Sequence, residues 1–172
     1  MLELIRPSVE RADEYLQICS EYGEVDKSNH IHIDSIEKAK ERIERDLLLE
    51  DSEILPIGRV RQFVRWAQNE EEIILGTCRI RIELNEKLRE KGGHIGYDVR
   101  PIYRKKGIGT EILKYALIEL WEKCYEDALV TCDDDNIGSY RIIENNNGIL
   151  ENKIFDEESG KLIRRYIIKR NN

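Results

Sequence analysis

Residues 96–110 read GYDVRPIYRKKGIGT, and the fold of this chain can be worked out from this stretch. The segment His94–Arg100 reads as a strand, which Pro101 closes, and a long helix with a broad apolar stripe is expected over about 107–125. The N-terminus of a helix carries free N–H groups and a partial positive charge. A basic loop at a strand-to-helix junction is therefore typical of a phosphate site.

The charges and glycines of this junction favour a diphosphate ligand. Cations at 100, 104, 105 and 106 lie close together in a chain whose formal net charge is −7. Gly107 and Gly109 allow the backbone to approach an anion without an intervening Cβ. A Walker loop needs a Gly-Lys-Ser/Thr ending that is missing here, and a dinucleotide fingerprint needs a third glycine where Ile112 stands. An ordinary basic helix start with a glycine turn is the alternative interpretation.

Hydrophobic periodicity extends this pattern along the chain. We expect helices over about 9–22, 35–49, 107–125 and from 137 to about 145, with strands over 2–5, 60–66, 73–84, 94–100, 128–132, 149–156 and 161–169. Ser35 is a suitable N-cap for the second helix. The order predicts an α/β (α+β) fold, with one domain over 1–172, a mixed sheet and helices on both of its faces.

The composition excludes several classes of protein. Apolar residues make up 40% and charged residues 37% of the chain, as in a globular enzyme. Because no apolar run could span a bilayer and the N-terminus lacks a signal pattern, we expect a cytoplasmic protein without a membrane partner. The acidic net charge argues against nucleic-acid binding and weakly favours a cationic acceptor, although it also serves solubility. The four cysteines lack CxxC spacing and read as reduced packing residues.

Two segments together carry a family resemblance. Gly96–Pro101 followed by Arg104–Thr110 is similar to Gln/Arg-x-x-Gly-x-Gly/Ala, the coenzyme A signature of the GNAT N-acetyltransferases. Asp135–Ser139 is similar to the Asn-x-x-Ala/Ser element of the same family. The resemblance covers about 60–155 and implies a GNAT-like, mostly antiparallel sheet of about seven strands. In that fold the strand that ends at Arg100 splays away from the strand over 128–132.

The resemblance implies acetyl-CoA as co-substrate and identifies the residues that would hold it. The pantetheine arm would lie between the splayed strands, and the pyrophosphate would contact the amides of 104–109. The implied cofactor-binding residues are Val99, Arg100, Arg104, Lys105, Lys106, Gly107, Ile108, Gly109, Thr110, Asn136 and Ser139. A homodimer would be usual for relatives.

Acetyl transfer to an amine needs a base for the ammonium proton and a proton for the departing thiolate. Many relatives use a tyrosine as the acid, but Ile143 stands at that position, so Tyr140, Tyr97, water or no group at all stay open. For the base we favour Glu83, on the polar face of its strand, and His94, which titrates in the useful range. Their alternatives are a solvated strand glutamate and a strand-end histidine bonded to backbone.

Three functions fit these residues. The first is an N-acetyltransferase that moves an acetyl group from acetyl-CoA to a small-molecule or peptide amine in a ternary complex. The second is a catalytically weak or inactive coenzyme A-binding regulator, and the third is another nucleotide-binding class. We expect no metal, because His30 and His32 lack a carboxylate or cysteine partner at ligand spacing and read as a surface loop.

Overall fold

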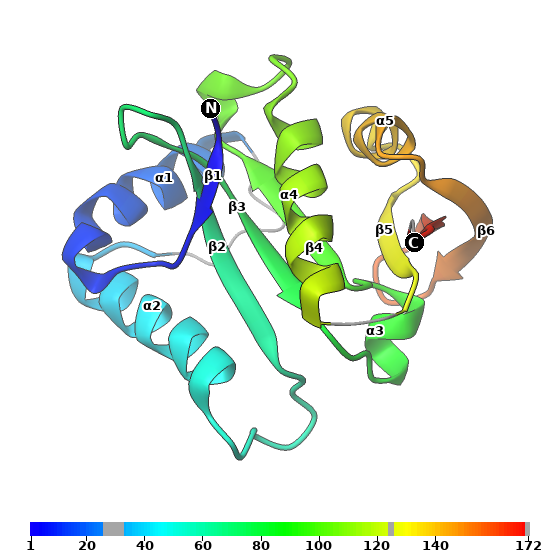
Figure 1. Ribbon diagram of the computed structural model, residues 1–172, viewed down its shortest axis with the longest axis horizontal. Helices are drawn as coiled ribbons and strands as arrows, with labels where there is room; N and C mark the ends of the chain where they lie inside the picture. The colour runs from blue at the N-terminus through cyan, green and yellow to red at the C-terminus, as the bar shows by residue number, and fades with distance from the viewer. Residues whose placement is uncertain (26–32, 124–125, 171–172) are drawn as a thin grey trace.

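The computed structural model describes residues 1–25, 33–123 and 126–170 (Figure 1). Its helices are α1 (Ala12–Val25), α2 (Ile36–Asp51), α3 (Glu86–Glu90), α4 (Ile108–Lys123) and α5 (Ile137–Asn145). Its strands are β1 (Glu3–Ile5), β2 (Gln62–Gln68), β3 (Ile74–Arg81), β4 (Ile95–Val99), β5 (Ala128–Asp133), β6 (Ile149–Asp156) and β7 (Lys161–Ile168). The predicted elements are confirmed, and α3 is added. His30, His32 and Cys124 lie outside the described residues.

The strands form two antiparallel sheets, with the orders β1-β2-β3-β4 and β5-β7-β6. The expected number of strands is confirmed, but they are divided between two sheets instead of forming one. In Figure 1 the helices α1 and α2 lie to the left of the first sheet, whereas α4 crosses in front of it and α5 lies beside the second sheet. Helices therefore cover both faces of the first sheet, as the sequence predicts.

Side-chain alternation along the strands divides the core into two layers. Trp66 on β2 belongs to a cluster with Ile18 of α1 and Ile43 of α2. Its neighbour Ala67 belongs to a second cluster, with Leu113 of α4. Because successive strand residues point to opposite faces, β2 and β3 are buried on both sides.

Local capping accounts for two helix starts. The Ser35 Oγ accepts a hydrogen bond of 3.2 Å from the Lys38 N–H, which confirms Ser35 as the N-cap of α2. The Asn85 Oδ1 accepts from the Leu88 N–H at 2.9 Å and caps α3 in the same way. Because α3 is short and has no apolar stripe, periodicity could not reveal it. Among the described helices, none is long and apolar enough to cross a bilayer.

The strands β4 and β5 meet at one end only. The His94 N–H donates to the Leu129 carbonyl at 2.7 Å, and the Leu129 N–H donates to the His94 Nδ1 at 2.9 Å. Beyond this His94–Leu129 contact, the described residues of β4 pair with β3 and those of β5 pair with β7. A gap therefore runs along β4 toward Val99, and the expected splay of the two strands is confirmed.

Candidate functional site

A pocket of about 540 Å³ lies where the end of β4, the loop before α4 and the start of α5 meet. It brings together most of the residues that the sequence predicts for coenzyme A binding, but Arg100 and Lys106 do not line it. Its lining consists of Tyr97, Asp98, Val99, Tyr103, Arg104, Lys105, Gly107, Ile108, Gly109, Thr110, Asn136, Gly138, Ser139, Arg141, Ile142 and Asn145.

Free backbone amides lie in the loop and the first helical turn that line this pocket. The helical ladder of α4 begins with the Thr110 and Glu111 N–H groups, which donate to the Gly107 carbonyl at 3.0 and 3.3 Å. The amides of 105–109 have no acceptor among the described residues. Lys105 and Gly107 have φ angles of 61° and 83°, which turn the loop back on itself. The helix N-terminus is thus left open for an anion.

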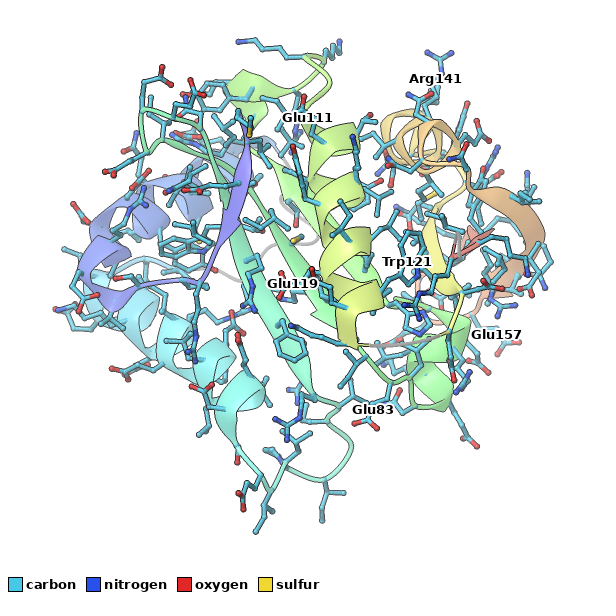
Figure 2. All side chains as sticks on the ribbon, viewed as in Figure 1. Glu83, Glu111, Glu119, Trp121, Arg141 and Glu157 are labelled. Carbon is cyan, nitrogen blue, oxygen red and sulfur yellow. The ribbon has the colours of Figure 1, made fainter. Side chains whose placement is uncertain are left out.

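Cations surround these amides. Arg104 and Lys105 are exposed at the pocket, and the Arg104 Nε donates to the Val99 carbonyl at 3.0 Å. Arg141, which Figure 2 shows on α5, also lines the pocket, and sequence reasoning missed it. The sequence signal that could have identified Arg141 was its position five residues after Asn136, within the predicted helix from 137 to about 145. Lys106 does not line the pocket, and its Nζ lies 5.4 Å from the centroid of the ring of Tyr103, which does.

Arg100 differs from the other basic residues of the motif. Its side chain is buried, forms an ion pair with Glu21 of α1 through contacts of 2.9 and 2.5 Å, and donates to the Ile74 carbonyl. Its own N–H donates to the Leu75 carbonyl at 2.9 Å. Arg100 therefore fixes the end of β4 to α1 and the first sheet, and the structure places neither its side chain nor its amide in the pocket.

The two glycines of the motif also have different roles. A Cβ on Gly107 would meet no atom within 4 Å, so this position faces open space. A Cβ on Gly109 would lie 2.5 Å from the Ile142 Cδ1 and 3.3 Å from the Val99 Cγ2. The missing side chain at 109 thus allows α4 to approach α5 closely, which the sequence-based interpretation did not anticipate.

Side chains bridge the gap at the inner end of the pocket. The Tyr97 hydroxyl on β4 lies 3.0 Å from the Ser139 Oγ and 3.2 Å from the Ser139 carbonyl on α5. The Asn136 Oδ1 accepts from the Ser139 N–H at 3.0 Å and so serves as the N-cap of α5. Burial raises the pKa of Tyr97, so its phenol stays protonated at neutral pH.

The helix α5 places its candidate acid outside the pocket. Tyr140 does not line the pocket, and the Arg164 guanidinium lies 4.1 Å from the centroid of its ring. Ile143, at the position where the resemblance places a tyrosine, is fully buried in the core. Gly138, Ser139, Arg141, Ile142 and Asn145 are the α5 residues that face the pocket.

Neither predicted base lies in the pocket lining. Glu83 is exposed beyond the end of β3, which stops at Arg81 and not at 84 as the alternation suggested. Figure 2 places Glu83 at the opposite end of the molecule from Arg141. His94 is only 3% exposed, and its Nδ1 is occupied by the Leu129 N–H. His94 forms the contact between the two sheets, which agrees with the alternative interpretation of a strand-end histidine bonded to backbone.

This buried state of His94 should make stability depend on pH. Burial lowers the pKa of His94 from 6.5, so the unfolded chain binds a proton before the folded chain does. We expect the free energy of unfolding to fall as the pH drops through 6.5 toward the lower folded value. His94→Asn, whose Oδ1 can replace the Nδ1 acceptor, should reduce this fall in urea unfolding at about pH 7.5 and 5.5. An equal fall in both proteins would contradict the assignment.

Asp98 is a pocket residue to which the sequence analysis gave no role. Asp98 is the acidic residue among those that line the pocket, and it lies between Tyr97 and Val99 on β4. Burial is the main cause of the raised pKa of Tyr22 on α1, and the negative charge of Asp98 raises this pKa further. Asp98 therefore lies near that helix. The sequence signal that could have found Asp98 was its place in the quoted strand, next to Val99.

Comparison with known proteins identifies the fold. The chain resembles the microcin C7 self-immunity acetyltransferase MccE, solved with acetyl-CoA and AMP, at 17% identity and a TM-score of 0.76 over 96% of this chain and 91% of that one. It also resembles a Salmonella typhimurium acetyltransferase that modifies the N-terminal serine of ribosomal protein L7/L12, at 15% identity and a TM-score of 0.76 over 99% and 95%. A spermidine N-acetyltransferase chimera, of SpeG from Vibrio cholerae and hSSAT, matches at 12% identity and a TM-score of 0.70 over 97% of this chain and 94% of that one.

No curated protein sequence gives a significant match to the chain. The family model described as the acetyltransferase (GNAT) family matches residues 17–148, which include both coenzyme A segments and most of the elements around the pocket. Members of this family use acetyl-CoA as co-substrate. The residues at the pocket fit that group, because free amides and cations line it beside the end of β4. This chain belongs to the GNAT acetyltransferase family.

Proposed function

We propose that this chain transfers an acetyl group from acetyl-CoA to a primary amine directly, in a ternary complex. The observation that carries the proposal is the set of free amides at 105 and 107–109, residues that line the pocket beside the end of β4. The diphosphate would bind these amides together with Arg104 and Lys105. The pantetheine arm would then lie along β4, which is the edge strand of the first sheet in the described part of the chain.

The reaction forms one bond and breaks another. The acceptor ammonium loses a proton to a base, and the neutral nitrogen attacks the thioester carbonyl carbon. The C–N bond forms, the C–S bond breaks, and the departing thiolate takes up a proton. Backbone N–H groups along the unpaired edge of β4 would stabilise the negative charge that develops on the carbonyl oxygen.

Two pocket residues suit the proton transfers. Asp98 supplies a carboxylate that could accept the ammonium proton, directly or through water. Tyr97 supplies a phenol that remains protonated because burial raises its pKa, and its contact with Ser139 holds it at the gap. We assign these roles in place of Glu83, His94 and Tyr140, none of which lines the pocket.

Ligand-induced stabilisation tests the proposal. Coenzyme A at about a hundredfold excess over its dissociation constant should add about 2.7 kcal/mol to the free energy of unfolding. The melting temperature is measured with coenzyme A, acetyl-CoA and ATP at equal concentrations. The assignment is overturned if neither coenzyme A nor acetyl-CoA raises the melting temperature, or if ATP raises it more than they do.

A coenzyme A-binding regulator without catalysis is the second candidate, because Ile143 replaces the acid used by many relatives and is buried. Release of free thiol from acetyl-CoA in the presence of an amine panel separates the two functions. Turnover above the buffer rate removes the regulator, and Asp98→Asn should then lower kcat at least tenfold while coenzyme A still binds. Unchanged kcat in that variant would exclude Asp98 as the base.

A further inference from the structure

A second pocket, of about 510 Å³, lies between α2 and the first sheet and shares no lining residue with the coenzyme A pocket. Its wall is formed by α2, the segment before β2, and the end of β3. The lining residues are Arg42, Arg45, Asp46, Leu48, Leu49, Pro56, Arg59, Gln62, Arg79 and Arg81. Arginine is thus the dominant residue, in a chain whose net charge is −7. We refer to this site as the arginine pocket.

The positive charge of the arginine pocket is largely uncompensated. The carboxylate of its one acidic residue, Asp46, already accepts from the Arg42 Nε at 2.8 Å, and both residues are buried. The side chains of Arg45, Arg59 and Arg79 have no hydrogen-bond or ion-pair partner among the described residues. Guanidinium groups without a carboxylate are well suited to bind an oxyanion through paired N–H donors.

Arg79 and Arg81 lie two residues apart on β3 and share a face of the sheet. Both are half-buried, and the Arg81 Nη1 donates only to backbone carbonyls, at 3.0 Å for Gly93. Burial lowers the pKa of Arg81 to about 10, and the charge of Arg79 adds to this effect. The free protein therefore holds two like charges together in a poorly hydrated place, which a bound anion would relieve.

The register of the sheet connects the arginine pocket with the proposed reaction. Arg79 lies directly opposite Gly96 of β4, and a Cβ on Gly96 would meet no atom within 4 Å. Open space therefore adjoins β4 on the face that carries Arg79. The next residue, Tyr97, lines the coenzyme A pocket. A molecule anchored by Arg79 would lie beside the strand along which the thioester is expected.

We propose that the arginine pocket binds an anionic oxygen group, a carboxylate or a phosphate, of the acyl acceptor. The acceptor is then an amine that also carries an acidic group, and this inference rests on the proposed acetyltransferase function. It reverses the expectation of a cationic acceptor drawn from the net charge of the whole chain, because the local charge at the acceptor side is positive.

Matched ligands that differ only in charge test this proposal. The protein is first saturated with coenzyme A, whose own binding is recorded, so that the diphosphate site is filled. Two pairs of ligands are then titrated by calorimetry. The first pair is Ala-Glu-Glu-Ala and Ala-Gln-Gln-Ala, both amidated at the C-terminus, and the second is O-phosphoethanolamine and ethanolamine. We expect the acidic member of at least one pair to bind tenfold or more tightly than its neutral partner. The pair that shows the difference identifies carboxylate or phosphate as the anchor.

Two substitutions show whether the arginine pocket causes that difference. Arg79→Gln should abolish it, and the variant should fold because it removes a side chain without a partner beside Arg81. Arg45→Gln, at the exposed rim, should reduce it without touching the sheet. Arg89→Gln on α3 removes the same charge outside the pocket and should leave the difference intact.

Equal affinities within both pairs, or a difference that survives Arg79→Gln, would overturn the proposal. Because coenzyme A binding is recorded first, the two levels of inference can be separated. Failure to bind coenzyme A removes the acetyltransferase assignment together with this one. Normal coenzyme A binding without a preference for acidic ligands removes the acidic acceptor alone.

Discussion

Gly107→Val is expected to eliminate measurable coenzyme A binding while the chain remains folded. Gly107 has a φ of 83°, and its Cβ would project into open space at the floor of the coenzyme A pocket. The valine methyl groups would occupy the place of the diphosphate, and the loop that presents the free amides would have to change its backbone angles. The left-handed conformation itself would cost about 1–2 kcal/mol of stability.

Gly58→Val is the matched control for backbone strain. Gly58 has a φ of 79°, its Cβ would also meet no atom within 4 Å, and it does not line the coenzyme A pocket. Both variants should lose similar stability in urea unfolding, but only Gly107→Val should lose the calorimetric signal with coenzyme A. Wild-type affinity in a folded Gly107→Val protein would mean that the diphosphate binds elsewhere.

Arg100→Ala is expected to destabilise the protein by about 3–5 kcal/mol, because it breaks a buried ion pair and leaves one partner uncompensated. The Arg100 side chain is 6% exposed and that of Glu21 is 20% exposed. The substitution also leaves the Ile74 carbonyl without its guanidinium donor. Urea unfolding measures the loss, and Glu21→Gln should cause a smaller loss of the same sign.

Arg104→Ala is the control for this effect. Arg104 is exposed and lines the coenzyme A pocket, so we expect a loss of less than about 1 kcal/mol in stability together with weaker coenzyme A binding. The two variants should therefore separate stability from ligand affinity. Equal stability in Arg100→Ala and Arg104→Ala would contradict the role that the contacts give to Arg100.

The sequence could predict the diphosphate loop because the physics of that loop is local. A glycine with positive φ, a run of cations and the start of an apolar helix lie within a few residues of one another. The sequence could not separate Arg100 from Arg104, because the partner of Arg100 is Glu21, 79 residues away along the chain. The two roles differ only once α1 has packed against the end of β4.

Non-local geometry also limited the prediction of the catalytic residues. Glu83 follows the alternation of β3, yet the strand ends at Arg81, because its pairing with Gln62 of β2 and not periodicity sets its length. His94 has a suitable ordinary pKa, but its contact with Leu129 depends on a second sheet that no local pattern reveals. The arginine pocket combines α2 with β3, so no local pattern in the sequence marks Arg79.

The division of the strands into two sheets has a consequence for the life of the protein in a cell. Among the described residues, the backbone contact between β4 and β5 lies at His94 and Leu129, and beyond it side-chain packing holds the two sheets together. An acyl donor bound between β4 and β5 would stabilise the folded protein and lower the population of locally opened molecules that a protease can cut. The abundance of such a protein would then follow the supply of its own co-substrate.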